Sequence, residues 1–323
     1  MAGLPLVMAC ETPLFEPLWD GTVQVADVEL SFVRHPTRAG DRHRRMRDDL
    51  AFDVCEYSSG NYLNGFPFGL PFTALPIFPL RSFRQRDIWV ARAGGVAAPE
   101  QLNGKRIGIQ MWSNSALVWQ RALLQHDYGL DLRSVEWVSN GQDDPRYEVP
   151  AWVRLRPCPP GQTLEGLLAA GEIDAMLIPH EPAWAPGDLA RVRRLIPDYV
   201  PVEQDYFRRT GLFPPMHTVV VKNSVLAAHP WLAASLYDGL RRALDVYVAR
   251  QRAVQAPSVV WPGLSWAEQE AVLGPQPWPA GLAANRPTLD AWLDYAHEQG
   301  VIAERLAPET LFQLDGRALV PAD

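Results

Sequence analysis

The sequence predicts an α/β protein of two lobes, each built from strands and helices in alternation. Three observations lead to this prediction. Strand-like and helix-like segments alternate along most of the chain, which is typical of α/β architecture. A first α/β unit ends in the strand-like run 87–91, and a second unit covers about residues 94–214. The long apolar run 216–221 then returns the chain to the first unit.

In the first lobe, apolar and alternating segments predict short strands separated by helices. The expected strands lie at residues 6–10, 23–32, 52–55 and 72–78. The expected helices lie at residues 41–50 and 58–63 and, after the return strand, at 230–250, 266–273 and 287–299. Helix 41–50 is polar, so we expect it to expose one face.

In the second lobe, the run 99–110 predicts a helix, a turn and a strand. Helix 113–126 follows, with Ser113 as its candidate N-cap. Gly171 is expected to end a later helix, because glycine readily adopts the left-handed conformation found there. The remaining elements are expected at residues 135–138 (strand), 163–170 (helix) and 174–178 (strand).

These segments place residues 1–88 and 220–323 in lobe I and residues 89–219 in lobe II, with two hinge crossings. Ligands of such two-lobed bodies bind in the cleft between the lobes, at the carboxyl ends of strands. We therefore look for site residues directly after the predicted strands.

Composition and charge narrow the classes of function. The 323 residues include 30 Lys and Arg against 37 Asp and Glu, a net charge of −7. Nucleic-acid binders are usually basic, so neither nucleic acid nor an anionic membrane is an expected partner. No apolar run approaches the roughly 20 residues that span a bilayer, and the first residues lack a basic signal segment. We expect a cytoplasmic protein and leave its oligomeric state, including a homo-oligomer, open.

The cysteines and cofactor motifs point to no cofactor. Cys10, Cys55 and Cys158 lie far apart without metal-like spacing, and we expect Cys10 and Cys55 to be buried. The chain has no GxSxG, phosphate-loop or GxGxxG motif. A metal site could still be assembled from His180, His217 and a carboxylate, although no HxH or HExxH motif supports one.

Polar and ionisable side chains follow nearly every predicted strand, as expected for a site that binds a small polar ligand. They are Glu11 and Thr12; Glu56, Tyr57 and Ser58; Arg81 and Arg84; Trp112, Ser113 and Asn114; His180; and His217, which opens the return strand. We expect them to converge on one site.

The anion-binding candidates are two arginines and one helix start. Arg81 and Arg84 are candidate clamps for a carboxylate, because a guanidinium makes bidentate bonds to this group. The helix that starts at 112–115 offers free backbone N–H groups to an anion, and Ser113 and Asn114 add side-chain donors. Trp112 either stacks on an aromatic ring of the ligand or packs in the core.

Two histidines and one glutamate are candidates for proton transfer. His180 and His217 lie beside prolines at opposite ends of buried strands, and unperturbed histidine titrates near pH 6.5. Glu56 either orients a histidine, holds a ligand hydroxyl or caps the following helix. Glu11 is a weaker candidate of the same kind. The remaining histidines, His43 among them, are expected to be surface or structural.

Stretches along the whole chain resemble the 4,5-dihydroxyphthalate decarboxylase family, an offshoot of the type II periplasmic-binding-protein fold. The most specific are RTGLFPPMHTVVV (209–221) and PWPAGLAANRPTL (277–289). The others are FDVCEYS (52–58), PIFPLRSFR (76–84), LNGKRIGI (102–109), LLQHDYGLD (123–131), LLAAGEIDAML (167–177) and RRLIPDY (193–199). Two places depart from the family pattern. This chain has Glu11-Thr12-Pro13 where the family usually has an Asp-Arg pair, and it has Gln85 where the family usually has a histidine.

The resemblance implies a carboxy-lyase of aromatic-acid catabolism, in phthalate degradation. The implied substrate is 4,5-dihydroxyphthalate, and the products are 3,4-dihydroxybenzoate and carbon dioxide, with no cofactor. On this basis Arg81, with Arg84, would hold the retained carboxylate. One histidine would take a proton from a ring hydroxyl, and the other histidine or Glu56 would protonate the ring carbon.

Four alternatives stay open. The same fold serves solute-binding proteins of transporters, cytoplasmic or exported, because a fold does not fix a function. A related lyase could act on another aromatic acid, as the two departures suggest. A metal-dependent decarboxylase or hydrolase is the third alternative, and a regulatory binding module the fourth.

Overall fold

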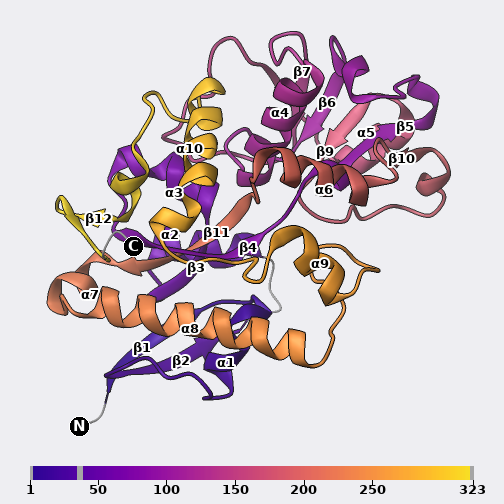
Figure 1. The fold of residues 1–323 in the computed structure, drawn as a ribbon. Helices are drawn as coiled ribbons and strands as arrows, with labels where there is room; N and C mark the ends of the chain where they lie inside the picture. Colours follow the sequence, from indigo (N-terminus) through magenta and orange to yellow (C-terminus); the bar gives the residue numbers. More distant parts are fainter. Residues whose placement is uncertain (1–2, 35–38, 321–323) are drawn as a thin grey trace. The chain divides into compact units, whose positions relative to one another are not determined.

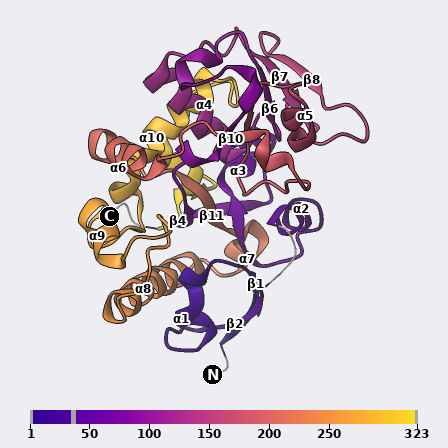
Figure 2. The same ribbon diagram turned by 90° about the vertical axis from the view of Figure 1, so that its right-hand side faces the viewer.

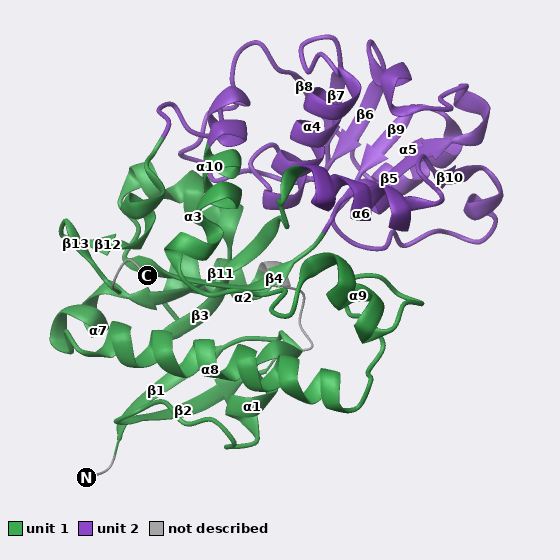
Figure 3. Ribbon diagram, viewed as in Figure 1, with its two compact units in different colours: residues 1–82, 210–293, 306–323 green, residues 83–209, 294–305 purple. Residues whose placement is uncertain are grey.

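The computed structural model describes residues 3–34 and 39–320, which form two compact α/β units (Figure 3). Unit 1 comprises Met1–Ser82, Thr210–Leu293 and Leu306–Asp323, and unit 2 comprises Phe83–Arg209 and Asp294–Arg305. The sequence analysis placed all of 220–323 in the first lobe, whereas residues 294–305 group with unit 2. The boundary at Leu293 falls inside a continuous helix, where no sequence pattern marks it.

The sheet of unit 1 has the strand order β2-β1-β3-β11-β4 within the described residues. Its strands are β1 (Leu4–Ala9), β2 (Val28–Val33), β3 (Val54–Ser58), β4 (Phe72–Arg81) and β11 (Pro215–Lys222). β1 runs parallel to β2 and β3, whereas β11 is antiparallel to both β3 and β4. β11, which lies between β3 and β4, therefore places His217 opposite Ser58 of β3.

Helices of unit 1 pack around this sheet (Figures 1 and 2). They are α1 (Glu16–Trp19), α2 (Ala39–Asp49), α3 (Ser59–Gly65), α7 (Asn223–Ala228), α8 (Leu232–Ala253), α9 (Trp266–Leu273) and α10 (Leu282–Glu298), whose last turn belongs to unit 2. Both views show α8 alongside α1, and α8 buries Leu236, Leu240 and Leu244 on one face. A short hairpin, β12 (Gln313–Leu314) and β13 (Arg317–Ala318), lies near the C-terminus.

The sheet of unit 2 has the order β10-β5-β9-β6-β7-β8 within the described part of the chain. Its strands are β5 (Ile88–Ala91), β6 (Arg106–Ile109), β7 (Glu136–Ser139), β8 (Arg154–Pro157), β9 (Ala175–Leu177) and β10 (Val192–Arg194). β9, β6, β7 and β8 are mutually parallel, and β5 is antiparallel to its neighbours. The loops that leave the parallel strands therefore gather at one edge of this sheet.

Three helices belong mainly to unit 2: α4 (Ser115–Tyr128), α5 (Leu164–Ala170) and α6 (Tyr199–Thr210). The side chain of Thr163 caps α5, and Gly171 ends it at φ 74°, as predicted. The apolar face of α5 packs into a core that includes Trp89 and Met176. The sequence did not predict α6. Pro197 lies two residues before this helix and Pro201 lies in its first turn, and prolines there are typical of a loop.

Several expected boundaries were wrong in ways that matter for the site. Glu56 and Ser58 lie inside β3 rather than after it, and Arg81 is the last residue of β4. α10 begins at Leu282, before Pro287, so this proline lies inside the helix and does not start it.

Cys10 and Cys55 are fully buried, as expected. Among the described residues, no helix is both long and apolar enough to cross a membrane.

We expect Gly239→Ala to destabilise unit 1. Alanine in a helix is normally about 1 kcal/mol better than glycine. At Gly239, however, a Cβ atom would lie 2.6 Å from Cγ2 and 3.3 Å from the backbone Cα of Val25. Relieving such overpacking typically costs about 1–3 kcal/mol, so the free energy of unfolding should fall.

The measurement is urea denaturation, with Gly166→Ala in α5 as the matched control. A Cβ at Gly166 meets only the Thr163 hydroxyl, at 3.3 Å, so this variant should be neutral or stabilised. Equal stabilisation of both variants would show that the contact with Val25 is not tight.

Candidate functional site

The structure divides the predicted site residues between the two units. Unit 1 holds Glu11, Thr12, Glu56, Tyr57, Ser58, Arg81 and His217, and unit 2 holds Arg84, Trp112, Ser113, Asn114 and His180. Each set is described within its own unit.

The centre of the unit 1 set is a buried hydrogen bond between Glu56 and His217. Their side chains share one face of the sheet, because Glu56 lies two residues before Ser58, which pairs with His217. His217 Nδ1 lies 2.6 Å from Glu56 Oε1, and the two residues are 8% and 1% exposed. The pairing of β11 with β4 is irregular on either side of His217.

The other oxygen of the Glu56 carboxylate binds the chain that follows β1. Glu56 Oε2 accepts hydrogen bonds from the backbone N–H groups of Glu11 at 2.9 Å and Thr12 at 3.2 Å. These two residues follow the first strand, as predicted, and they meet the Glu56 side chain through their backbone. The carboxylate therefore ties β1, β3 and β11 together.

Arg42 of α2 completes the cluster, and sequence analysis missed it. Arg42 Nε donates to the backbone oxygen of Glu56 at 2.9 Å, and its Nη1 lies 2.8 Å from Glu11 Oε2. Its Nη2 lies 3.6 Å from Glu56 Oε1. Helix 41–50 is so rich in charge that it was expected to expose a polar face. The buried Met46, one helical turn after Arg42, was the available signal that this face points inward.

These contacts fix the ionisation of Glu56 and the tautomer of His217. Burial alone would raise the pKa of Glu56, but the hydrogen bond and charge of His217, Arg42 and the N–H of Glu11 outweigh it and lower the pKa to about 2. Glu56 is therefore a hydrogen-bond acceptor at neutral pH, and Nδ1 of His217 carries the proton between them. Nε2 of His217 has no hydrogen-bond partner among the described residues.

His43 of α2 is buried directly against His217. The two rings meet edge to face, with centroids 4.9 Å apart and planes at 90°. Burial, the neighbouring His217 and Arg42 lower the pKa of His43 well below its ordinary value, so its imidazole is neutral. From the sequence this histidine was expected to be surface or structural, because its segment lacks the buried strand and prolines that lie beside His180 and His217.

Three other unit 1 candidates make contacts that hold the fold. Tyr57 is fully buried, with its ring 5.0 Å from that of Phe72. Ser58 caps α3 by accepting a hydrogen bond from the backbone of Asn61. The Thr12 hydroxyl accepts from the N–H of Leu14 and caps the short turn after β1.

Arg81 is a buried guanidinium without an acidic partner among the described residues. Its Nη1 donates to the backbone oxygen of Phe213 at 2.8 Å, and its Nη2 donates to the side-chain oxygen of Asn285. The rings of Phe78 and Phe213 lie 5.3 and 5.9 Å from its Cζ atom. Burial lowers the pKa of Arg81 to about 9, which leaves it a cation at neutral pH. Such a group attracts an anion.

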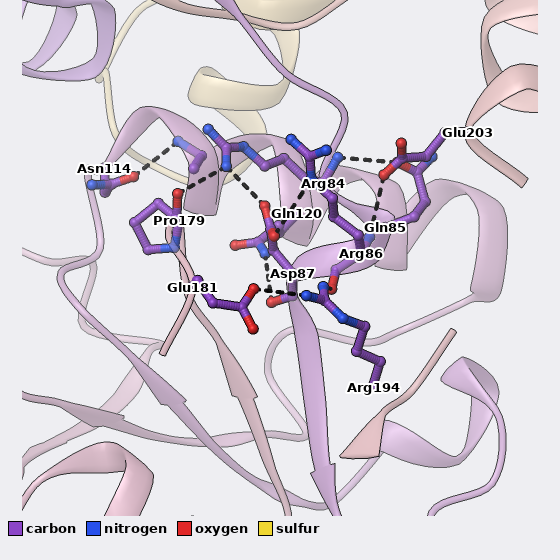
Figure 4. A network of polar contacts seen from close by, with 11 residues as sticks. Arg84, Gln85, Arg86, Asp87, Asn114, Gln120, Pro179, Glu181, Arg194 and Glu203 are labelled. Carbon is purple, nitrogen blue, oxygen red and sulfur yellow. Dashed lines mark hydrogen bonds and ion pairs between the residues drawn. The ribbon is translucent and has the colours of Figure 1, made fainter. Parts of the chain in front are cut away.

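Arg84 is in a different situation, because it already has a carboxylate partner. Its Nη1 lies 2.8 Å from Asp87 Oδ2 and 3.1 Å from the backbone oxygen of Pro179 (Figure 4). In the same network, the N–H of Arg86 donates to Glu203, and Arg194 pairs with Glu181. The charge of Arg84 is therefore balanced within unit 2.

The helix start after β6 is also occupied by a carboxylate of the chain itself. Asp143, in the loop between β7 and β8, accepts hydrogen bonds from the N–H groups of Trp112 at 2.9 Å and Ser113 at 2.7 Å. The Ser113 hydroxyl also donates to Asp143. The N-cap of α4 is Asn114, which accepts from the N–H of Ala116, so the assignment of the cap to Ser113 was wrong.

Trp112 and His180 have opposite surroundings. Trp112 is fully buried, donates its indole N–H to the backbone oxygen of Gln299 at 2.9 Å and lies under the guanidinium of Arg121 at 3.8 Å. This favours its packing role. His180 is exposed on the loop after β9.

Loop 141–149, which carries Asp143, borders a surface hollow of about 490 Å³ at the carboxyl ends of β7 and β8.

We expect the stability of the protein to depend on pH through Glu56. The folded pKa is about 2 against an ordinary 4.5, so Glu56 stabilises the fold fully above pH 4.5 and loses this effect as the pH falls toward 2. Glu56→Gln should therefore lower the free energy of unfolding by about 3 kcal/mol at pH 7, and this difference should shrink on acidification.

Denaturant titrations at pH 7, 5, 4 and 3 measure this difference. The control is Glu181→Gln, which removes an exposed carboxylate that pairs with Arg194. A difference between Glu56→Gln and the unaltered protein that stays constant from pH 7 to pH 3 would contradict an ionised, stabilising Glu56.

Comparisons with solved structures identify the fold. The alkanesulfonate-binding protein SsuA from Xanthomonas axonopodis pv. citri is 15% identical, with a TM-score of 0.51, over 96% of this chain and 98% of that protein. The periplasmic aliphatic sulphonate binding protein SsuA from Escherichia coli is 11% identical, with a TM-score of 0.51, over 94% and 95%. The desulfurization enzyme DszB is 16% identical, with a TM-score of 0.52, over 95% and 96%. The chain therefore has the two-lobed α/β fold of periplasmic binding proteins, as predicted.

Comparisons of sequence identify the family. No protein-family model matches the chain. A 4,5-dihydroxyphthalate decarboxylase from Pseudomonas putida is 34% identical over 200 residues, which cover 59% of this chain and 76% of the relative. A 4,5-dihydroxyphthalate decarboxylase from Comamonas testosteroni is 32% identical over 306 residues, which cover 92% of both chains. With this identity along nearly its whole length, the chain belongs to the 4,5-dihydroxyphthalate decarboxylase family.

Proposed function

We propose that the protein is a carboxy-lyase that converts 4,5-dihydroxyphthalate to 3,4-dihydroxybenzoate and carbon dioxide. The observation that carries this proposal is the 32% identity to a decarboxylase of that name over 92% of the chain. Two features of unit 1 support it. Arg81 is a buried cation flanked by aromatic rings, and His217 has its Nδ1 oriented by Glu56 and its Nε2 without a hydrogen-bond partner among the described residues.

The chemistry needs an acceptor and a donor of protons. Each ring hydroxyl of the substrate is para to one of the two carboxylates. Nε2 of His217 takes the proton of the hydroxyl para to the leaving carboxylate, and this raises electron density at the carbon that bears that carboxylate. An acid then adds a proton to this carbon. The carbon–carboxylate bond breaks, its electron pair restores the aromatic ring, and carbon dioxide leaves.

Glu56 orients His217 in this scheme and does not supply the proton. With a pKa of about 2 it carries no proton to give at neutral pH. Its hydrogen bond keeps Nδ1 protonated and stabilises the imidazolium that forms when Nε2 accepts a proton. We propose His180 as the acid, because it is the other predicted histidine and is exposed on its loop.

Arg81 holds the carboxylate that the substrate keeps. A guanidinium and a carboxylate fit each other through two parallel hydrogen bonds. Arg84 is expected to contribute less, because Asp87 already balances its charge. The stacking of Phe78 and Phe213 around Arg81 suits a ligand whose carboxylate is attached to an aromatic ring.

The proposal is tested by incubating the purified protein with 4,5-dihydroxyphthalate, with and without a chelator. We expect release of carbon dioxide with the ultraviolet spectrum of 3,4-dihydroxybenzoate, in equal amounts, in both samples. Turnover that the chelator abolishes would make the reaction metal-dependent. Thermal stabilisation by aromatic dicarboxylates without any turnover would contradict the proposed reaction and favour a solute-binding role.

We expect His217→Ala to lower kcat by at least about 10²-fold, because a positioned proton-transfer group contributes about 10²–10⁴-fold. His180→Ala should lower kcat comparably if His180 delivers the second proton. The control is His126→Ala, which removes an exposed histidine paired with Glu298. Turnover of His217→Ala near that of the control would remove His217 from the reaction, and the same result for His180→Ala would remove His180.

A further inference from the structure

Asn285 lies next to Arg81 and has no role in the reaction proposed above. Both hydrogen-bond acceptors of the Arg81 guanidinium are neutral: the backbone oxygen of Phe213 and the side-chain amide oxygen of Asn285. Among the described residues no carboxylate pairs with Arg81, and its buried Nε has no hydrogen-bond partner. A buried cation is costly unless an anion compensates it, and a protein usually supplies that anion itself.

The amide of Asn285 is locked in the orientation that Arg81 needs. Its Nδ2 donates to the backbone oxygen of Pro279 at 2.9 Å and to that of Gly281 at 2.7 Å. Both N–H bonds of the amide are thereby used, so Oδ1 is the atom that faces Arg81. The N–H of Gly281 donates to Pro76 in β4 at 2.9 Å, which fixes this segment to the strand that carries Arg81.

An amide at this position has a consequence that a carboxylate would not have. Aspartate has nearly the shape of asparagine and would also accept the hydrogen bond from Arg81, although its second oxygen would face the backbone oxygens of Pro279 and Gly281 without a hydrogen to donate. It would, however, neutralise the guanidinium, as Asp87 neutralises Arg84. Asparagine fixes the position of the guanidinium and leaves its charge and its remaining donors to another anion.

We propose that Asn285 is a positioning residue that sets the specificity of the site for a carboxylate. It holds Arg81 through a neutral group, so that the guanidinium keeps its charge for the carboxylate that the substrate retains. This inference rests on the role proposed for Arg81 in the decarboxylation. Asn285 lies in the stretch PWPAGLAANRPTL, in which the sequence analysis assigned no site residue.

The experiment replaces the amide by a carboxylate and compares two ligands that differ by one carboxylate group. The variants are Asn285→Asp, Asn285→Ala and Arg81→Gln, and the probes are 3,4-dihydroxybenzoate, which carries a carboxylate, and catechol, which does not. Kd values come from calorimetry, and KM and kcat from turnover of 4,5-dihydroxyphthalate. Thermal melts report whether each variant folds.

We expect Asn285→Asp to raise KM and the Kd of 3,4-dihydroxybenzoate by about 10²-fold, with a smaller change in kcat. The Kd of catechol should change less than threefold. Asn285→Ala, which removes the hold on Arg81 without neutralising it, should raise the Kd of the acid by about tenfold. In the Arg81→Gln background, Asn285→Asp should have little further effect, since the charge that it neutralises is already gone.

A merely structural role for Asn285 would weaken acid and catechol alike and would lower kcat as much as it raises KM, and that result would overturn the proposal. So would an unchanged affinity of Asn285→Asp for the acid. If Asn285→Asp does not fold, equal losses of acid and catechol binding in Asn285→Ala serve as the contrary result. If the unaltered protein binds 3,4-dihydroxybenzoate without turning over 4,5-dihydroxyphthalate, the proposed decarboxylation is refuted. The Kd values of the variants for 3,4-dihydroxybenzoate and catechol then still decide the role of Asn285. Failure to bind any aromatic carboxylate would refute both.

Discussion

The arrangement of unit 1 depends on a carboxylate that is almost wholly buried. Glu56 is 1% exposed, and a lone carboxylate in such a place would cost several kcal/mol. This cost is offset by contacts from elements far apart in sequence: two N–H groups after β1, Arg42 of α2 and His217 of β11. Any shift of one of these elements would leave the carboxylate short of a partner. The charge therefore fixes their mutual positions more strictly than apolar packing alone would.

Three buried arginines show how the same side chain serves different purposes. Arg84 pairs with a carboxylate and is balanced. Arg121 binds the backbone oxygen of Trp112 and the side-chain oxygen of Gln299, and its guanidinium covers the Trp112 ring, so its role is to join the helix start to the 294–305 segment. Arg81 and Arg121 both have neutral acceptors and a buried guanidinium nitrogen without a partner in the described structure, but Arg81 lies near two aromatic rings, those of Phe78 and Phe213. Burial by itself does not distinguish these roles: the carboxylate partner sets Arg84 apart, and the two flanking rings set Arg81 apart.

The sequence was sufficient to predict the fold class and most of the elements, because strands and helices alternate with clear apolar patterns. It also pointed to Glu56 and His217 as candidates, whose side chains the structure places in contact, while their roles in a reaction stay predictions. It did not predict Arg42 or His43, since in a helix with so many charges the single apolar Met46 was the one marker of the buried face. Asn285 was hidden by Pro287, which suggested that the helix began later than it does. The loop contact of Asp143 with the 112–113 turn spans thirty residues and has no local signal at all.

That loop contact has a consequence for how ligands compete. A carboxylate held on the same chain, a few ångströms from the donors that it binds, acts at an effective concentration in the millimolar range or above. A free carboxylate at micromolar concentration could not displace Asp143 from the N–H groups of Trp112 and Ser113 by mass action alone. In unit 2, a carboxylate of the chain itself therefore binds the N–H groups of the helix start. In unit 1, Arg81 has no such carboxylate among the described residues. The charge of Arg81 therefore stays available to a dissolved carboxylate.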